Sequence, residues 1–357
     1  MNQNGDGVEY NREFVRKAWP LLALYDQAGW VRPPGDDDGA QYDKRRLEAE
    51  KAAIRARDER NELVRVQREL ARRDSMLDLV REAMLSELSP ALGYEPHAVV
   101  YSDNDVVVHL SDLHFGLEVS NCFNTYNADV LASRLNHYLS KIDEIRRRHQ
   151  SENCYVLLGG DLISGCIHLS LRLENNLDVI KQVKHVSLLL SQFLQELSKM
   201  FGRVEIYSVP GNHSRVQSRK DENLKGENFD ILVPFLLAAM LQNFKNIAIH
   251  DKNVEESVAM FNVRGQKVFG VHGDKDSMES VVQKLTMVWG VKPDIVLAGH
   301  RHTNGMRTIF DSKVIESGSV SGPDNYCMDK RLRNKPEQMA LVVSEAGLEC
   351  FYDIQLD

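Results

Sequence analysis

The sequence predicts an α/β fold, and three observations support this prediction. Short apolar runs that suit buried strands alternate along the chain with longer stretches of helical periodicity. Several runs, such as residues 294–298, are apolar on both faces, which is typical of parallel strands covered on both sides. Residues with metal-binding or acid–base chemistry follow directly after these runs, where open α/β sheets bind ligands. The 357 residues allow two domains, or one large domain with an appendage.

We expect residues 1–95 to form an N-terminal helical region and residues 96–357 to form the α/β domain. Residues 11–28 form one predicted helix, and residues 32–39, which contain Pro and Gly, form a linker. Residues 41–88 lack Gly and Pro and favour one long helix. A heptad pattern of apolar residues runs along it, with charged residues at Glu59 and Arg73. Two interpretations stay open: the helix packs on its own domain, or it forms a coiled coil in a homo-oligomer.

Strands and helices are expected to alternate through the second region. The predicted strands are Asp105–Leu110, Cys154–Leu158, 204–209, Ile247–His250, Val258–Val263, 267–271, 294–298, 339–344 and 350–354. The predicted helices are Ala128–His149, 173–200, 229–244 and 277–289. A polar stretch without periodicity spans residues 214–230, and long loops of this kind in compact domains are usually functional or disordered.

Five predicted strands end at residues that bind metal ions or transfer protons. In chain order these residues are Asp112 with His114, Asp161, Asn212 with His213, His272, and His300 with His302. In an extended segment residues i and i+2 point the same way, so we expect His300 and His302 to be presented together. Taken alone, Asp161 would also suit a helix N-cap. If the strands share one sheet region, their ends converge, and this set of carboxylates, amide and imidazoles suits divalent first-row metals.

The number of these residues indicates two metal ions. Without His213, the other seven side chains give about four contacts per ion only if one of them bridges, and the two oxygens of Asp161 suit that role. Two ions about 3.5–4 Å apart clamp phosphoryl oxygens and generate hydroxide near neutral pH. We therefore expect hydrolytic phosphoryl transfer by attack of a metal-bound hydroxide. His213 is expected to act as a general acid or to stabilise the oxyanion.

The order Asp-x-His, Gly-Asp, Gly-Asn-His, His-Gly, Gly-His-x-His resembles the signature of calcineurin-like metallophosphoesterases over about residues 106–354. This resemblance implies two packed mixed β-sheets flanked by helices, a four-layer fold. It implies that one ion is held by Asp112, His114, Asp161 and His302. It implies that the other is held by Asp161, Asn212, His272 and His300. His213 would face the scissile phosphate. We expect two divalent ions, Mn²⁺ first, with Fe, Zn, Ni and Mg as alternatives.

Two positions depart from the family pattern. Ser164 stands where members usually have a second Asp, and Ser214 follows Gly-Asn-His where Asp or Glu is common. Neither position is a metal ligand, so both metal ions should still bind. Which group orients the His213 imidazole stays open. The Arg-bearing signatures of phosphoprotein phosphatases are absent from the sequence. Residues 111–116 and the overall layout resemble the DNA-repair exonuclease branch, including phage-borne members.

The first functional hypothesis is a phosphodiesterase that cleaves nucleic acid, most simply DNA. Basic residues near the predicted site favour it, although they also suit an ordinary solvated loop. They are Arg215, Arg219 and Lys220, and in a late insertion Lys330, Arg331, Arg333 and Lys335. The second hypothesis is a small-molecule phosphatase or cyclic-nucleotide phosphodiesterase with the same metals. The third is a non-catalytic scaffold, against which the complete ligand set argues.

Charge and cysteine content add weaker constraints. The net charge of −8 gives no overall basic footprint for nucleic acid, although bound cations can reverse the sign at a site. The five cysteines form no CxxC pair, which suits reduced thiols in a cytoplasm. No apolar leader segment is present, and no apolar run approaches the ~20 residues of a membrane span. We therefore expect a cytoplasmic protein that does not bind membranes.

Overall fold

The computed structural model describes residues 20, 47–65, 67 and 102–357, except 168, 221, 225, 251, 252, 254 and 332. The chain separates into two compact units, residues 1–68 and 69–357. In the first unit residues 47–65 are helical, as predicted for this part of the long helix. The linker at 32–39, the helix at 11–28 apart from residue 20, the end of the long helix and the boundary expected at residue 95 lie outside the described residues.

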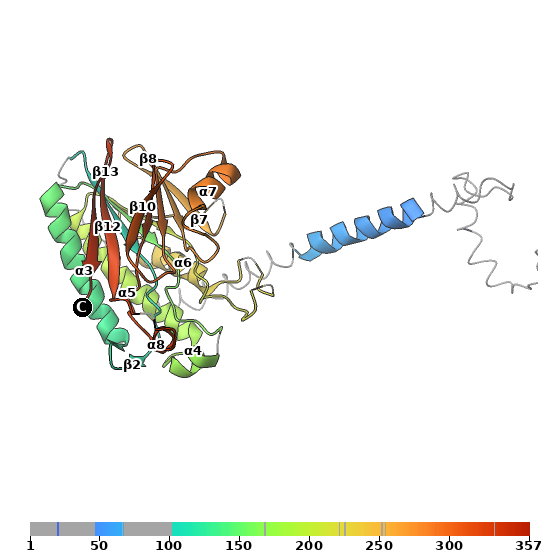
Figure 1. The fold of residues 1–357 in the computed structure, drawn as a ribbon, viewed down its shortest axis with the longest axis horizontal. Coiled ribbons are helices and arrows are strands. Elements are labelled where there is room, and N and C mark those ends of the chain that lie inside the picture. The colour runs from blue at the N-terminus through green and yellow to red at the C-terminus, as the bar shows by residue number, and fades with distance from the viewer. Residues whose placement is uncertain are drawn as a thin grey trace, which may run out of the picture. The chain divides into compact units, whose positions relative to one another are not determined.

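Two mixed β-sheets pack face to face in the second unit (Figure 1). The first sheet has the order β13 (Gly347–Gln355), β12 (Glu337–Ser344), β1 (Asp105–Leu110), β4 (Cys154–Leu158), β5 (Val204–Ser208), β6 (Ile247–His250). The second has the order β10 (Gly305–Ile309), β11 (Ser312–Glu316), β9 (Ile295–Ala298), β8 (Gln266–Val271), β7 (Val258–Val263). Strands β1, β4, β5 and β6 are parallel, as are β8, β9 and β11, whereas β12, β13, β10 and β7 join their sheets by antiparallel pairs.

Helices cover the outer faces of both sheets, which confirms the predicted four-layer fold (Figure 1). The covering helices are α3 (Ala128–His149), α5 (Val179–Met200), η1 (Phe229–Ile231) with α6 (Leu232–Met240), and α7 (Val281–Trp289). Two short helices, α4 (Leu169–Glu174) and α8 (Asn325–Asp329), lie in loops. One apolar core lies between α3, α5, α6 and the first sheet, a second between the sheets, and a third under α7.

The central strand β1 explains why the predicted strands have continuous apolar runs. Val106, Val108 and Leu110 face the helical layer, whereas Val107 packs between the two sheets. All four side chains are fully buried, because both faces of the sheet are covered. The carboxyl ends of β1, β4, β5, β8 and β9 lie at the same end of the sandwich, and the loops that leave them form the site.

Several predicted boundaries shift, and one predicted helix contains a break. The helix predicted at 173–200 is two helices, α4 and α5, because Asp178 caps α5 by accepting a hydrogen bond from the N–H of Lys181 (3.0 Å). The predicted helix 229–244 begins as the 3₁₀ turn η1 and ends at Met240. The hairpin β2 (Val119–Ser120) and β3 (Thr125–Tyr126) was not predicted. In the described part of the chain, no helix is long and apolar enough to span a membrane.

Candidate metal centre

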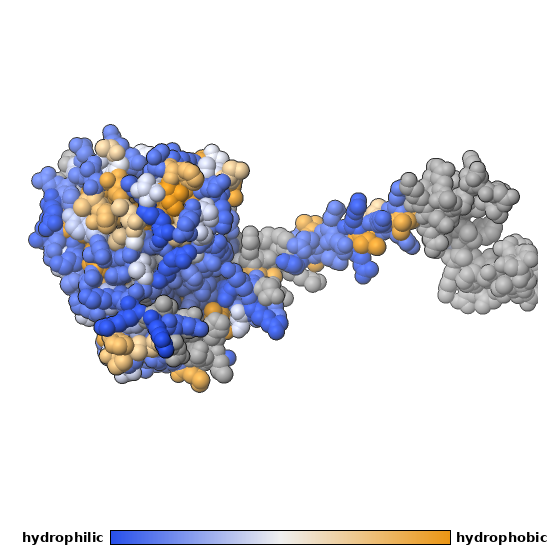
Figure 2. Space-filling view, viewed as in Figure 1, coloured by the Kyte–Doolittle hydropathy of each residue, from blue (hydrophilic) through white to orange (hydrophobic). Residues whose placement is uncertain are grey.

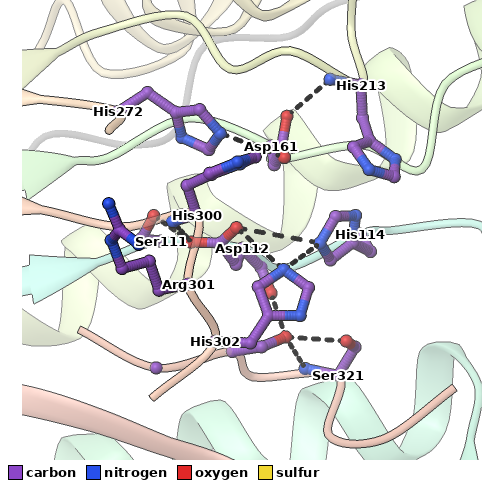
Figure 3. Close-up of polar contacts among 12 residues, drawn as sticks. Ser111, Asp112, His114, Asp161, His213, His272, His300, Arg301, His302 and Ser321 are labelled. Atoms are coloured by element: carbon purple, nitrogen blue, oxygen red, sulfur yellow. Dashed lines mark hydrogen bonds and ion pairs between the residues drawn. The ribbon is translucent and has the colours of Figure 1, made fainter. Parts of the chain in front are cut away.

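Seven of the eight predicted site residues converge at the carboxyl ends of strands from both sheets (Figure 3), and Asn212 joins them through His272. Three groups have donor atoms that all lie within 4.8 Å of one another. The groups are Asp112–His114–His302, His114–Asp161–His213, and Asp161–His272–His300. Asn212 joins the last group, since its Oδ1 lies 3.1 Å from His272 Nε2. Asp161 and His114 each belong to two groups, so the groups are continuous.

In the first group, Asp112 presents one oxygen to two imidazoles. Its Oδ1 lies 3.2 Å from His302 Nε2 and 3.8 Å from His114 Nε2, and the two Nε2 atoms are 3.2 Å apart. Oδ1 accepts no hydrogen bond, while Oδ2 is held by Ser111 Oγ (2.5 Å) and by the N–H of His300 (3.0 Å). With metal–ligand bonds of about 2.1 Å, two ligands of one ion lie about 3.0–3.4 Å apart. Two of the three distances lie in this range and the third, between Asp112 Oδ1 and His114 Nε2, is wider by about 0.4 Å, so the group needs only a small adjustment to share one divalent ion.

The group of Asp161, His272 and His300 has the same character. Asp161 Oδ2 lies 3.1 Å from His272 Nε2 and accepts no hydrogen bond, while Oδ1 accepts one from the N–H of His213 (2.7 Å). His272 Nδ1 lies 2.8 Å from the carbonyl oxygen of Gly159, a contact that assigns the proton to Nδ1 and leaves Nε2 as the donor atom for a metal. Asp161 thus stands between the groups with one oxygen unpaired, as a bridging carboxylate requires.

Charges in this buried cluster are balanced among the residues themselves. Burial alone would raise the pKa values of Asp112 and Asp161, but contacts with His302 and His272 outweigh it and lower both. Burial opposes charge on His272 and His302 as well, yet the same carboxylates raise their pKa values to about 10. Burial and the charge of His213 lower the pKa of His114 to about 3. A divalent cation would replace the two imidazolium protons, so the donor set fits the metals that the sequence predicts.

Five of the predicted ligands have left-handed backbone conformations. Their φ angles are +55° for Asp112, +49° for His114, +50° for Asp161, +70° for His300 and +57° for His302. Non-glycine residues seldom adopt this conformation, and strained residues gather at functional sites. The prediction that i and i+2 residues point together from an extended segment is therefore wrong for His300 and His302. The turning backbone sends them to different groups, while Arg301 between them pairs with Glu316 (3.0 Å).

Two glycines allow the loops after β4 and β5 to approach each other. A Cβ atom at Gly211 would lie 2.1 Å from Asp161 Oδ1, and one at Gly160 would lie 2.6 Å from the backbone nitrogen of Gly211. Gly160 also has a φ of +90°. The glycines of Gly-Asp and Gly-Asn-His are thus required because each loop passes directly against the other.

His213 is held by backbone groups. Its Nδ1 lies 3.4 Å from the carbonyl oxygen of Ser164, and its ring meets the ring of His114 edge-on with centroids 4.6 Å apart. Gly165 passes so close to His213 that a Cβ there would lie 2.0 Å from the His213 carbonyl oxygen. Ser164 and Ser214, the two departures from the family pattern, are fully buried. The Ser164 carbonyl oxygen therefore contacts the His213 imidazole in the absence of a carboxylate at position 214.

A clamp from η1, which the sequence did not predict, holds Gly211 from both sides. Asp230 Oδ2 accepts a hydrogen bond from the Gly211 N–H (2.9 Å), and Asn228 Nδ2 donates to the Gly211 carbonyl oxygen (2.7 Å). Burial, followed by the charge of Asp161, raises the pKa of Asp230 to about 6. Asp230 follows Gly211 by 19 residues at the end of a stretch without periodicity, so no sequence signal pointed to it.

The three predicted substrate-binding residues lie on the loop that follows His213. Arg215 is half-buried, whereas Arg219 and Lys220 are exposed. Arg219 pairs with Glu222 (2.8 Å) and Lys220 with Asp274 (3.2 Å). Exposed ion pairs of this kind contribute little free energy, so both cations can exchange their partners for a phosphate at small cost.

Comparison with known proteins gives the class of the chain. Residues 106–342 match the family model described as the calcineurin-like phosphoesterase superfamily domain. The chain belongs to this superfamily, which confirms the predicted family and, at the level of the superfamily, a phosphoesterase hydrolase with candidate metal-binding residues.

Individual relatives are more distant. The SPbeta prophage-derived uncharacterized protein YonJ of Bacillus subtilis is 22% identical over 315 residues, which are 81% of this chain and 77% of that protein. A novel archaeal phosphodiesterase shares 14% identity with a TM-score of 0.34, covering 70% of this chain and 99% of that one. Zinc-complexed Vps29 from Entamoeba histolytica shares 11% identity with a TM-score of 0.34, covering 71% of this chain and 99% of that one.

Proposed function

We propose that this chain is a metal-dependent phosphodiesterase that cleaves nucleic acid. The observation that carries the hydrolytic chemistry is the pair of His–Asp groups that meet at Asp161, each with a buried carboxylate oxygen that accepts no hydrogen bond. The proposed metal ligands are Asp112, His114, Asp161, Asn212, His272, His300 and His302. Bound divalent ions, Mn²⁺ first, would supply positive charge that stabilises phosphoryl oxygens and acidifies water.

The chain's own residues position the reaction. In our proposal the His213 imidazole donates a proton to the leaving oxygen of the scissile ester. The backbone N–H of His213 donates a hydrogen bond to Asp161 and its ring nitrogen Nδ1 contacts the Ser164 carbonyl oxygen, which together hold the residue beside the metal groups. The clamp of Asn228 and Asp230 on Gly211 keeps the same loop from shifting. Such positioned acids typically contribute 10²–10⁴-fold to the rate.

Basic side chains on two segments that contact the loops of the proposed ligands support a nucleic-acid substrate. Arg215, Arg219 and Lys220 follow His213 on one loop. The late insertion with Arg331 and Arg333 reaches the last ligand loop, where the Asn334 side chain donates a hydrogen bond to the carbonyl oxygen of His302 (2.9 Å). A polynucleotide presents phosphates on both sides of the scissile one, and cations spaced in this way would contact them.

A substrate panel with the full-length protein tests this proposal. Protein loaded with Mn²⁺ is incubated with single- and double-stranded DNA, RNA, a cyclic nucleotide, bis(p-nitrophenyl) phosphate and p-nitrophenyl phosphate, with excess chelator as control. We expect chelator-sensitive cleavage of oligonucleotides and of the small diester. Hydrolysis of the monoester or the cyclic nucleotide alone would favour the small-molecule alternative, and activity that survives excess chelator would contradict the metal mechanism.

We also infer that the N-terminal helix joins copies of the chain and that the protein works in the cytoplasm. The described part of that helix exposes three large apolar side chains, which supports a partner helix. They are Leu47, Ile54 and Leu63. The location and the oligomeric state both stay predictions.

A further inference from the structure

An exposed aromatic ring with a cation over one face lies on the hairpin of β2 and β3, which contacts the loop of Asp112 and His114 through Tyr126. Phe123, in the turn between β2 and β3, is 49% exposed. The guanidinium carbon of Arg333, also an exposed residue, lies 4.4 Å from the centre of the Phe123 ring. Figure 2 shows apolar and strongly hydrophilic side chains side by side at the lower end of the domain, where Figure 1 places β2, α4 and α8.

Hydrogen bonds fix the turn that carries Phe123. Asn121 Oδ1 accepts from the N–H groups of Phe123 and Asn124, both at 2.9 Å. The side chains of Asn121 and Asn124 donate to the carbonyl oxygen of Pro323 at 3.3 and 3.1 Å. The ring is therefore held on a braced hairpin beside the segment that leads into α8, so little conformational entropy is lost when a ligand packs on it.

Both members of the pair are connected to the loops of the proposed ligands. Asn334, next to Arg333 in the chain, donates to the His302 carbonyl oxygen (2.9 Å) and to Thr303 Oγ1 (2.5 Å). Consecutive Cα atoms are about 3.8 Å apart, so Arg333 stands one residue from a direct contact with the His302 loop. The hydroxyl group of Tyr126, three residues after Phe123, donates to the carbonyl oxygen of Leu113, between Asp112 and His114.

We propose that Phe123 and Arg333 form a nucleotide subsite for single-stranded nucleic acid, beside the metal groups. The base of a nucleotide flanking the scissile phosphate stacks on the Phe123 ring, and the Arg333 guanidinium stacks on the base or pairs with its phosphate. Aromatic rings and arginine planes are the surfaces on which proteins stack unpaired bases. Because a paired base hides its faces in the duplex, the subsite selects single strands. This inference rests on the proposed nuclease function.

Matched phenylalanine variants test the subsite in the full-length protein. Phe351, on β13 and 43% exposed, is the control for Phe123. The Phe123→Ala variant should raise KM for a single-stranded oligonucleotide about 5- to 100-fold, the range expected for the loss of one stacked base. Phe123→Trp and Phe351→Ala should stay within about twofold of the wild type. In the Phe123→Ala variant, kcat/KM for the oligonucleotide should fall at least about fivefold more than kcat/KM for bis(p-nitrophenyl) phosphate. The wild type should cleave single strands in preference to a blunt duplex.

Each result that contradicts the expectation shows whether the subsite or the nuclease function is wrong. If Phe123→Ala behaves like Phe351→Ala while the wild type cleaves oligonucleotides, the subsite is wrong and the nuclease function stands. Equal losses on both substrates, or a lowered melting temperature that Phe123→Trp does not restore, would mean that Phe123 supports the loop rather than a base. If the wild type cleaves the small diester but neither binds nor cleaves oligonucleotides, the nuclease function is wrong and the subsite falls with it.

Discussion

Replacing Asp161 with Asn changes the charge shared by the two metal groups and little else. Asp161 has a φ of +50°, and Asn is among the few residues that adopt this conformation readily. The Asn Oδ1 can still accept the hydrogen bond from the N–H of His213, and the amide nitrogen takes the place of Oδ2 beside His272. The fold should therefore survive, while one negative charge is lost from two of the three donor groups.

The expected loss of rate follows from the charge that the metals contribute. A metal ion typically stabilises transition-state charge by several kcal/mol, and each ~1.4 kcal/mol corresponds to tenfold in rate. If the variant holds one ion instead of two, a loss of about 4–5 kcal/mol lowers kcat/KM for the small diester by roughly 10³-fold. Metal content should fall from about two ions per chain towards one, because Asp161 is the proposed bridge.

Elemental analysis and diester hydrolysis after Mn²⁺ loading measure both effects on one sample. Asp311→Asn is a matched control, because Asp311 also has a left-handed backbone, with a φ of +65°, but lies in the turn between β10 and β11. The control should keep wild-type metal content and activity. If Asp161→Asn keeps two ions and full activity, or if the wild type is fully active in excess chelator, the bridging role of Asp161 is refuted.

Four further predictions follow from the site and the sequence. His213→Ala should lower turnover about 10²–10⁴-fold with near-normal metal content; parallel loss of metal would make His213 a ligand instead. Replacing the three loop cations with Ala should weaken DNA binding and flatten its salt dependence, with a smaller effect on a small diester; equal losses would mean that the loop shapes the active site. The cations are Arg215, Arg219 and Lys220. The pKa of Asp230 in the folded protein is about 6, above its ordinary value of 3.8, so the folded state binds the proton more tightly than the unfolded state. The stability that this proton contributes is present below about pH 4 and is lost as the pH rises through 6. Between pH 4 and pH 7 the wild type should thus lose about 2 kcal/mol relative to Asp230→Asn in urea unfolding, and parallel pH profiles would contradict the assignment. A chain starting at His97 should keep metal binding and diester hydrolysis but form a smaller assembly than the full-length chain by light scattering. If the shortened and the full-length chains are both monomers, the coiled coil is excluded.

Strands buried on both faces were predictable because each is a short, mostly apolar run that ends close to residues with metal-binding or acid–base chemistry. Strand β1 is an example: the predicted and observed bounds agree, and Asp112 and His114 follow at its end. The split between α4 and α5 was missed because apolar periodicity continues across it. The residue that starts the second helix is the N-cap Asp178, whose side chain accepts a hydrogen bond from the backbone N–H of Lys181. An aspartate within an apolar periodic pattern does not reveal this role until the structure is known.

Contacts between distant segments could not be predicted from local patterns. Asp230 reaches Gly211 across a loop without periodicity, and Arg333 covers Phe123 from a segment 210 residues away. Both depend on how the loops pack once the sheets are formed. The sequence pattern indicated which residue types lie at the strand ends, whereas the partners that hold those loops come from tertiary structure.

The left-handed ligands explain why spacing alone misplaced His300 and His302. A left-handed conformation costs about 1–2 kcal/mol for a residue with a Cβ, so the five ligands together carry several kcal/mol of strain. The net stability of a whole domain is only about 5–15 kcal/mol. Hydrogen bonds between the loops offset part of this cost, among them those from the N–H groups of Asp112 and His114 to the carbonyl oxygens of Gly160 and Asp161, both at 3.0 Å. Other left-handed residues with a Cβ, such as Gln150 and Asp311, lie at a helix end or in a turn, where this conformation is ordinary. Five of them on the donors of one cluster is what a fold tolerates for the chemistry of a site rather than for its own stability.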